Sequence, residues 1–184
     1  VLAVAGKYAY SLDYYENQLS VIDISDPVNP SVVGTLQVKA GTISQQATEN
    51  SIAVQGRYVY LTQTASSTFT IVDVNDPTAP SIAGSLTGLT AAKGVAVAGR
   101  YAYVGIPGIS AFGVIDVSNP ASPSLVATTS VTGIQSLALA GRYVFTINGA
   151  NNSVSLIDIG DPSAPRLIKT VSSIGSSGSG IQVS

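Results

Sequence analysis

One unit of sequence is written four times along the chain, and this repetition limits the possible fold more than any other feature. Each copy opens with an apolar run, a glycine, a basic residue and an aromatic pair, as residues 95–103 show in the third copy. An aspartate follows each glycine at a constant distance of 17 residues. The repeated glycines are Gly6, Gly56, Gly99 and Gly141, and the repeated aspartates are Asp23, Asp73, Asp116 and Asp158. Such strict spacing indicates four copies of one structural unit.

Within each copy the pattern indicates strands. Apolar residues follow a period of two and are rich in Val, Ile, Tyr and Thr. In the third copy we expect strands over residues 95–98, 101–104 and 113–117, and a fourth near residues 124–128. Gly99 lies in the first turn because glycine readily adopts the positive φ of tight hairpins.

A unit of 42 to 50 residues with four strands has the size of one propeller blade. Several strands are apolar on both faces, as expected when neighbouring sheets cover each side. We predict an all-β fold, a β-propeller or partial propeller of four four-stranded antiparallel blades, in one repeat domain over residues 1–184. The predicted blades are residues 1–50, 51–92, 93–134 and 135–179.

The last five residues, 180–184, match the opening of another unit. They are predicted to start a further blade or to form a closing strand. On this interpretation the 184 residues belong to a larger propeller, either because the chain continues or because copies associate. The Ser/Gly-rich stretch before them, residues 172–180, is alternatively a flexible linker.

These residues resemble the LVIVD-repeat family, whose signature is a Gly-x-Tyr-Ala-Tyr strand, a Val-Ile-Asp-Val/Ile-Ser strand end and an Asp-Pro-x-x-Pro turn. In this chain the signature is found at residues 8–10 and 21–27 and in the copies around Tyr58, Tyr101 and Tyr143. Small departures occur at Asn119, Gly160 and Phe145. The resemblance implies propeller blades of bacterial or archaeal surface and secreted proteins, and it implies no single activity.

Composition narrows the possible functions. The chain contains no Cys, His, Met or Trp, which removes thiolate nucleophiles, Ser-His-Asp relays and the usual zinc, haem and iron-sulfur ligand sets. A net charge of -2 without any Lys/Arg run argues against nucleic acid as a partner. No apolar run approaches the roughly 20 residues that span a bilayer, so direct membrane insertion is not expected. We expect a non-enzymatic protein without a cofactor.

The repeated aspartates allow two interpretations. A ring of carboxylates near a propeller axis could hold a cation, and calcium at these turns stays open as an alternative. Each aspartate also ends a strand before a turn, where an Asx side chain accepts backbone N–H groups. We favour the structural role and predict no metal site. The second acids of the turns, Asp26, Asp76 and Asp161, are interpreted as solvated turn residues.

The repeated aromatic and basic positions are also given structural roles. The aromatic pairs could stack sugars or bases, but we expect them to fill the space between blades. They are Tyr8 and Tyr10, Tyr58 and Tyr60, Tyr101 and Tyr103, and Tyr143 and Phe145. Lys7, Arg57, Arg100 and Arg142 are expected to be solvated hairpin tips.

Outside the repeat, one loop combines exposed aromatic residues with charge. The predicted contact patch is Asp13, Tyr14, Tyr15 and Glu16, because loops on rigid scaffolds often bind. The polar segment 40–50 is the second candidate. Asn151 begins an Asn-Asn-Ser glycosylation sequon in the equivalent loop of the fourth copy.

These features predict an extracellular or cell-envelope scaffold that mediates protein-protein or surface interactions as part of a larger protein or assembly. The expected partner is another protein or a second copy of the chain. The alternative function is a carbohydrate-binding or small-ligand-binding propeller, with calcium as a further possibility.

Overall fold

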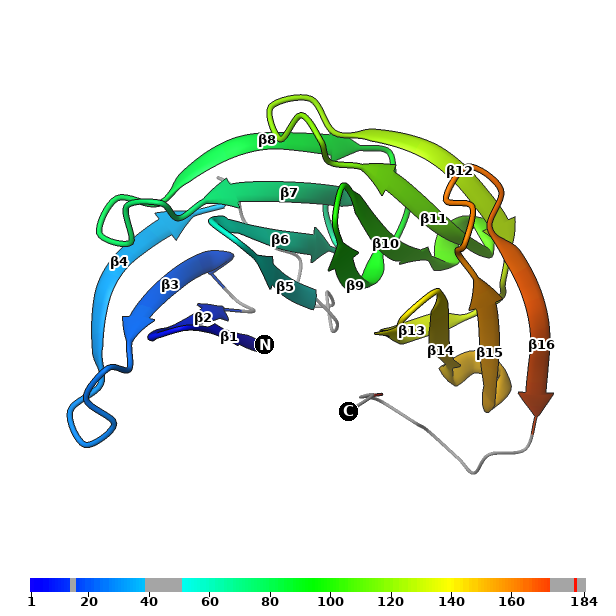
Figure 1. Ribbon diagram of the computed structural model, residues 1–184, viewed down its shortest axis with the longest axis horizontal. Helices are drawn as coiled ribbons and strands as arrows, with labels where there is room; N and C mark the ends of the chain where they lie inside the picture. The colour runs from blue at the N-terminus through cyan, green and yellow to red at the C-terminus, as the bar shows by residue number, and fades with distance from the viewer. Residues whose placement is uncertain (14–15, 39–50, 173–180, 182–184) are drawn as a thin grey trace.

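The computed structural model describes residues 1–13, 16–38, 51–172 and 181. These residues form four four-stranded antiparallel sheets (Figure 1), so the predicted all-β fold of four blades is confirmed. Blade 1 contains β1 (Leu2–Ala5), β2 (Tyr8–Leu12), β3 (Gln18–Asp23) and β4 (Ser31–Gln37). Blade 2 contains β5 (Ser51–Gln55), β6 (Tyr58–Gln63), β7 (Thr68–Asp73) and β8 (Ser81–Thr87).

Blades 3 and 4 repeat this order and add one short 3-10 segment each. Blade 3 contains β9 (Lys93–Ala98), β10 (Tyr101–Ile106), η1 (Pro107–Ile109), β11 (Ala111–Asp116) and β12 (Ser124–Ser130). Blade 4 contains β13 (Ile134–Ala140), β14 (Tyr143–Asn148), η2 (Gly149–Asn151), β15 (Ser153–Asp158) and β16 (Arg166–Ser172). No described helix is long and apolar enough to cross a membrane.

Each blade is a simple meander in which sequence neighbours pair. The first hairpin of blade 3 shows the local cause, because Gly99 has φ +59° between the paired residues Ala98 and Tyr101. The glycines at the other three hairpins, Gly6, Gly56 and Gly141, have φ between +58° and +61°. A positive φ at this position closes a tight turn. A residue with a Cβ would be strained in this backbone conformation.

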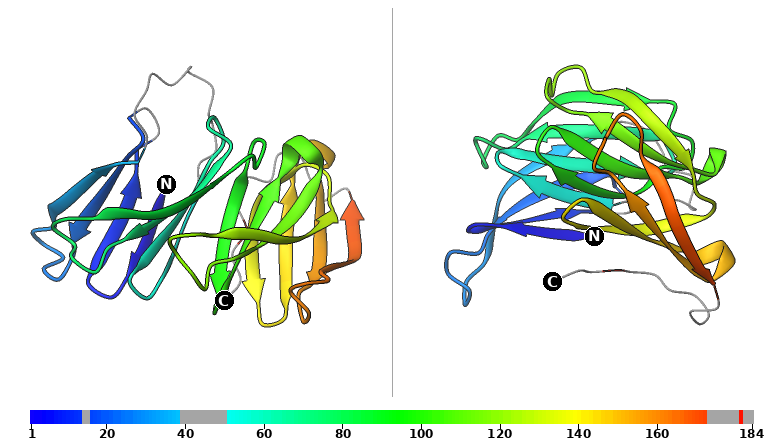
Figure 2. Two further views of the ribbon diagram at one scale, coloured as in Figure 1. Left: turned by 90° about the horizontal axis from the view of Figure 1, so that it is seen from above. Right: turned by 45° about the vertical axis from the view of Figure 1, so that its right-hand side comes forward.

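The four sheets stand side by side in an open arc (Figure 1). Their first strands lie on the inner side, where β1 contacts β5, β5 contacts β9 and β9 contacts β13. The fourth strands, β4, β8, β12 and β16, follow the outer side of the arc. Figure 2 shows the same sheets from above and from one side.

Antiparallel order separates two ends of the blades. The turn face holds the turns between first and second strands and between third and fourth strands. The loop face holds the connections between second and third strands and from one blade to the next. We use these two names below.

The hydrophobic core lies between the sheets, in three layers. The layer between blades 2 and 3 joins Phe69 and Ile71 of blade 2 to Val104 and Ile115 of blade 3. All four side chains are fully buried. Equivalent layers join blade 1 to blade 2 and blade 3 to blade 4. Each blade therefore has a leading face toward the preceding blade and a trailing face toward the following one.

The outer strands share an irregularity that the sequence pattern does not reveal. In every blade the register between third and fourth strands shifts at the same position, which leaves one extra residue in the fourth strand. The extra residues are Val33, Ala83, Val126 and Ile168. Such β-bulges increase local twist and interrupt the unpaired edge of a strand.

The outer strands also hold the turn of the next blade. A Cβ on Gly34 would lie 2.1 Å from the carbonyl oxygen of Pro77, and one on Gly84 would lie 2.3 Å from that of Pro120. These approaches require glycine. The predicted start of a further blade, residues 180–184, lies outside the described residues except for Ile181.

Candidate functional site

The repeated aspartates lie on the turn face, each as the last residue of a third strand. The Asp73 carboxylate accepts the backbone N–H of Asn75 at 2.9 Å, and the Asp116 carboxylate accepts that of Ser118 at 2.9 Å. Asp23 and Asp158 accept the same hydrogen bond from Ser25 and Gly160. This is the Asx interaction expected from the sequence, and it anchors the turn between third and fourth strands in every blade.

The basic residue of the first hairpin reaches the same aspartate. The Arg57 guanidinium lies 2.9 Å from Asp73, and the Arg142 Nε donates to Asp158 at 3.1 Å. Arg100 pairs with Asp116 in blade 3. The three arginine side chains are more than half exposed, but each also pairs with an aspartate. The prediction that they are only solvated hairpin tips is therefore wrong.

A basic residue also covers the first tyrosine of its blade. Arg57 lies 5.0 Å from the ring centre of Tyr58, and Lys7 lies 5.1 Å from that of Tyr8. The corresponding distances in blades 3 and 4 are 5.3 and 5.5 Å. These cation–π contacts are within the usual 6 Å range. Each basic residue therefore links a strand to a turn.

The environment of these carboxylates favours their charged form. Hydrogen bonds from Ser118, followed by the Arg100 guanidinium, lower the pKa of Asp116 to about 2. The Arg142 guanidinium and then the Gly160 N–H lower the pKa of Asp158. Hydrogen bonding to an ionised oxygen and a nearby cation both act in this direction.

The second acids of the turns have similar partners. Asp76 accepts the Thr78 N–H at 2.9 Å and its hydroxyl at 2.7 Å, and Asp161 accepts both groups of Ser163. Asp26 accepts the Asn29 side-chain amide at 2.9 Å and the Val28 N–H at 3.0 Å. These hydrogen bonds lower the pKa of all three carboxyls. The acids are exposed, yet they organise their turns.

The described residues contain no group of three or more His, Cys, Asp or Glu side chains placed to hold a metal ion. The calcium alternative stays an untested prediction at the repeated turns. The four repeated carboxylates at these turns already accept backbone N–H groups.

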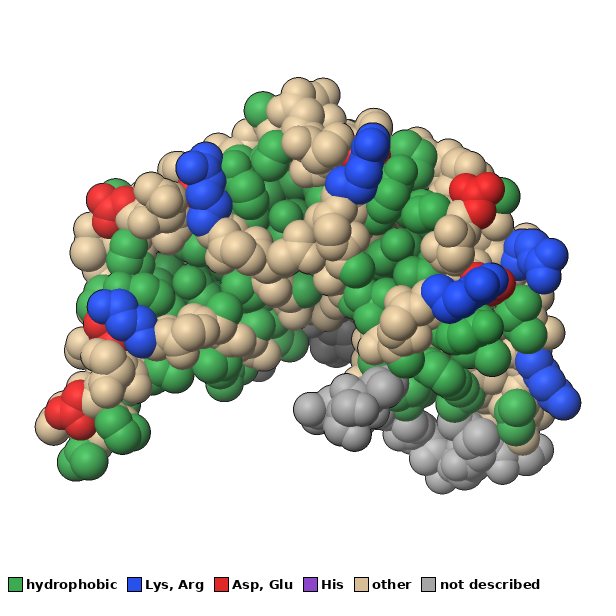
Figure 3. All heavy atoms as spheres, viewed as in Figure 1, with side chains coloured by type: hydrophobic (Ala, Val, Ile, Leu, Met, Phe, Trp, Pro, Cys, Tyr) green, Lys and Arg blue, Asp and Glu red, His purple; other side chains and the backbone are tan. Residues whose placement is uncertain are grey.

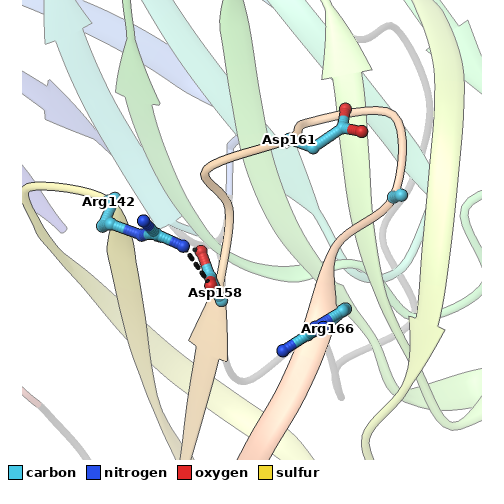
Figure 4. A pocket seen from close by; sticks show the side chains of 5 residues that line it. Arg142, Asp158, Asp161 and Arg166 are labelled. Atoms are coloured by element: carbon cyan, nitrogen blue, oxygen red, sulfur yellow. Dashed lines mark hydrogen bonds and ion pairs between the residues drawn. The ribbon is translucent and has the colours of Figure 1, made fainter.

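A surface pocket of about 330 Å³ opens on the turn face of blade 4. Figure 4 shows Arg142 and Asp158 joined on one side, with Asp161 and Arg166 around the same space. Arg166 occupies the first position of the outer strand, where the other blades have Ser31, Ser81 and Ser124. The pocket therefore combines two cations and two anions on an exposed surface.

The predicted contact patch falls in the loop between β2 and β3. Asp13 and Glu16 are exposed, and the Asp13 carboxylate accepts the Glu16 N–H at 2.7 Å. The Glu16 carbonyl accepts a hydrogen bond from the Gln37 side chain. Tyr14 and Tyr15 lie outside the described residues, as does the second candidate segment, residues 40–50.

The predicted glycosylation site lies in the equivalent loop of blade 4, between β14 and β15. Asn151 ends the η2 segment and is exposed on the loop face. Ser153 of the sequon is buried, and its hydroxyl accepts a hydrogen bond from Asn148 at 3.1 Å. The acceptor amide is therefore accessible and the sequon hydroxyl is enclosed.

The repeated tyrosines fill the layers between blades. Tyr10, Tyr60 and Tyr103 are almost fully buried, and Tyr60 and Tyr103 stack on Phe69 and Phe112. Burial raises the pKa of all three hydroxyls. These rings are not free to stack a sugar or a base.

One surface feature was not predicted from the sequence. The second residue of every outer strand is aliphatic and remains 40 to 60% exposed. These residues are Val32, Ile82, Leu125 and Leu167, which we call the outer row. Figure 3 shows hydrophobic side chains gathered between the charged residues on one face of the arc. The alternating pattern of the strands does not predict this row, because alternation alone cannot show which apolar residues the next blade covers.

Solved structures share this fold at low sequence identity. A periplasmic gluconolactonase from Pseudomonas aeruginosa is 18% identical with a TM-score of 0.71, over 95% of this chain and 52% of that one. A protein from Bacteroides fragilis is 13% identical with a TM-score of 0.74, over 94% and 54%. A protein from Lactobacillus plantarum is 14% identical with a TM-score of 0.70, over 90% and 54%.

The chain therefore spans about half the length of these three structures. At such identities the likeness shows the fold alone. No curated protein shows a significant match to the chain in sequence.

The model of the LVIVD repeat matches the chain four times, over residues 1–38, 48–87, 90–131 and 134–173. Each match contains the four strands of one blade. The repeated glycine, aromatic pair and turn aspartate described above lie inside every match. The chain belongs to the LVIVD-repeat family.

Proposed function

We propose that the chain is a non-enzymatic scaffold that binds other proteins of an extracellular or cell-envelope assembly through the outer edges of its blades. The observation that supports this proposal is the outer row, Val32, Ile82, Leu125 and Leu167. Edge strands are commonly protected by charged residues. Four aliphatic residues at one exposed position therefore favour a contact surface.

The bulges favour a specific mode of contact. Each outer strand has its extra residue directly after the outer-row position, so its unpaired backbone is irregular there. Continuous addition of a partner strand requires a regular edge. We therefore expect partners to bind through side chains that enter the apolar spaces between charged turns.

Substitution on the outer row tests the proposal. The double variant Ile82→Asp, Leu125→Asp places two charges on the row and is expected to lose most partner binding. Ile109→Asp is the control, because Ile109 is 59% exposed but lies on the η1 segment of the loop face. Chemical cross-linking in an envelope extract of the source organism, followed by mass spectrometry, compares the proteins captured by each form. Equal capture by wild type and double variant would contradict the proposal.

Cellular location is tested separately with the intact protein. We expect it in the envelope or medium fraction after cell fractionation, beside marker proteins for each compartment. Recovery with the cytoplasmic markers would reject the extracellular part of the proposal and would leave partner binding to be judged by the capture experiment.

The second candidate is binding or hydrolysis of a carbohydrate derivative. It is supported by one structural neighbour, a gluconolactonase, and by the charged loop with Asp13 and Glu16. Gluconolactone hydrolysis and calorimetric sugar binding, measured for wild type and Asp13→Ala, Glu16→Ala, would decide. Activity lost in the double variant would favour this candidate over the scaffold.

A further inference from the structure

Asn148 and Gly149 are the only Asn-Gly pair in the sequence. They lie where β14 ends and the η2 segment begins, on the loop face of blade 4 (Figure 1). Asparagine followed by glycine is the dipeptide most prone to spontaneous deamidation, because glycine has no side chain to shield its backbone nitrogen. At the position of Asn148 the other blades have Asp13, Gln63 and Ile106. Blade 4 therefore differs from its neighbours in the chemistry of this loop.

The folded chain holds the Asn148 side chain in a hydrogen-bonded cluster. Its Oδ1 atom accepts the Thr146 hydroxyl at 2.8 Å, and its Nδ2 atom donates to Ser155 at 2.7 Å and to Ser153 at 3.1 Å. Ser155 also shares a hydrogen bond of 2.9 Å with Thr170. Asn148 and its three partners are each at most 2% exposed. The amide is therefore fixed by three hydrogen bonds and shielded from solvent.

The backbone around Gly149 is restrained as well. Asn148 and Ser153 form the last pair of the β14–β15 ladder. A Cβ on Gly149 would overlap the Gln135 side chain, which therefore covers the glycine. Residues 150–152 beyond this pair are exposed. The Asn-Gly pair thus lies at the end of a hairpin, where local opening requires less free energy than in the middle of a sheet.

We propose that Asn148–Gly149 is a covalent modification site that the cluster keeps closed and that local opening of the β14–β15 loop exposes. In the open loop the Gly149 nitrogen bonds to the Asn148 Cγ atom, the bond from Cγ to Nδ2 breaks, and ammonia leaves with the proton of the Gly149 N–H. Water then opens the succinimide ring at either carbonyl group, which leaves aspartate or isoaspartate in place of Asn148. The closed cluster prevents the first step, because the amide cannot turn toward Gly149 without losing its hydrogen bonds.

Modification would remove the cluster that delays it. A carboxylate cannot donate to Ser153 and Ser155, and it brings a charge to a position that is only 2% exposed. Isoaspartate also adds a carbon to the backbone and disturbs the pairing with Ser153. Asn148 shares a face of β14 with Val144, which packs in the layer between blades 3 and 4. The reaction is therefore a one-way switch that loosens this layer.

Peptide mapping after incubation at mildly alkaline pH tests the proposal. Trypsin releases residues 143–166 as one fragment, in which tandem mass spectrometry distinguishes Asn148 from Asn151 and Asn152. We expect Asn148 to be converted first in the urea-unfolded chain, and at least about tenfold more slowly in the folded chain, because opening limits the reaction. Equal rates in the two states would overturn the proposal.

Three variants determine whether the cluster is the gate. Thr146→Val and Ser155→Ala each remove a hydrogen bond of the Asn148 amide. Both should speed its conversion several-fold in the folded chain and leave the rate in the unfolded chain unchanged. The control is Thr70→Val, which removes a buried hydroxyl at the position of Ser155 in blade 2. Equal acceleration by Thr70→Val would mean that global unfolding exposes the site, and no acceleration by the first two variants would mean that the cluster is not the gate. Either result contradicts the proposal.

The effect of the product is measured separately with Asn148→Asp. This variant should melt at a lower temperature and show faster hydrogen exchange in β14 and β15 than wild type. Asn151→Asp adds the same charge at an exposed position of the same loop and should change neither property. Identical melting and exchange for Asn148→Asp and wild type would reject the switch.

Discussion

The repeated aspartate joins two turns of its blade through one side chain. In blade 3 the carboxylate of Asp116 accepts the Ser118 N–H on one side and pairs with Arg100 on the other. The backbone adds a third link, because the Val117 N–H donates to the Arg100 carbonyl at 2.9 Å. The first hairpin and the outer turn are thereby held together on the turn face. Blades 2 and 4 have the same combination.

Acid should weaken this arrangement within a defined window. The pKa of Asp116 is about 2 in the folded chain against 3.8 for an ordinary aspartate, so the folded state favours the ionised form. The stabilisation is present above pH 3.8 and is lost as the pH falls through about 2. Urea unfolding midpoints measured from pH 5 downward should fall most steeply between about pH 4 and pH 2.

Two substitutions test the contribution of Asp116. Asp116→Asn keeps an oxygen for the Ser118 N–H but cannot ionise, so its midpoint should depend less on pH. Asp116→Ala loses both the turn hydrogen bond and the ion pair with Arg100 and should be less stable than Asp116→Asn at pH 7. An acid dependence identical in wild type and Asp116→Asn would contradict this assignment.

Only part of this residue chemistry can be predicted from the sequence. The Asx interaction is local, since Asp116 and Ser118 are two residues apart, and the turn composition indicates it. The Arg100–Asp116 pair spans 16 residues and depends on strand register, with Tyr101 opposite Asp116. A first hairpin considered alone predicts a solvated Arg100. The register of the second and third strands brings Arg100 to Asp116.

At the scale of the element, the contribution of a side chain on a blade face to stability depends on whether another blade covers it. Equivalent positions in blades 2 and 4 allow a direct comparison, because Ile71 is fully buried and Leu156 is only partly buried. Ile71→Ala should destabilise the chain by about 2–5 kcal/mol through lost burial and a residual cavity. Leu156→Ala removes a side chain of the same size and should cost clearly less.

Chemical denaturation at low protein concentration measures both changes. Low concentration matters because association of copies would bury Leu156 and raise its cost. Equal losses of stability for the two variants under dilute conditions would mean that Leu156 is as well covered as Ile71. That result would contradict the partial exposure of Leu156.

Strand patterns predicted the blades but not their outer edges. Alternating apolar residues and hairpin glycines suffice to place four strands per unit. In blade 3 the observed strands overlap the predicted ranges, with ends that differ by up to two residues. The bulges at Val33, Ala83, Val126 and Ile168 leave no such mark, because an extra residue in an exposed strand changes only which neighbour it opposes. The exposure of the outer row is not predictable either, because alternation alone does not show which apolar residues another blade covers.

For the whole molecule, stability should be greatest in the middle of the arc. Among the residues that the structure describes, blades 2 and 3 are covered on both faces, while blades 1 and 4 are covered on one. In stacked repeats each unit is stabilised chiefly by its neighbours, and end units open first. Hydrogen exchange of the dilute chain, followed by mass spectrometry, should show the slowest amides in β6, β7, β10 and β11. Uniform protection across the four blades would contradict this expectation.

Stacking of sheets is predictable from the sequence, but the size of the ring is not. Apolar residues on both faces of strands such as β7 require neighbouring sheets, which the four-blade prediction used. Ring size depends on the small angle between adjacent sheets, summed over all blades, and no single residue type determines it. The close approach of Gly34 to Pro77 and of Gly84 to Pro120 is likewise evident only from the folded arrangement.

Every sheet is formed by one uninterrupted stretch of chain, with strands in sequence order. A genetic duplication or loss of one unit would therefore insert or delete a whole wedge without breaking any strand pairing. Junctions on either side would again join a trailing to a leading face. This architecture lets evolution alter the number of wedges in single steps.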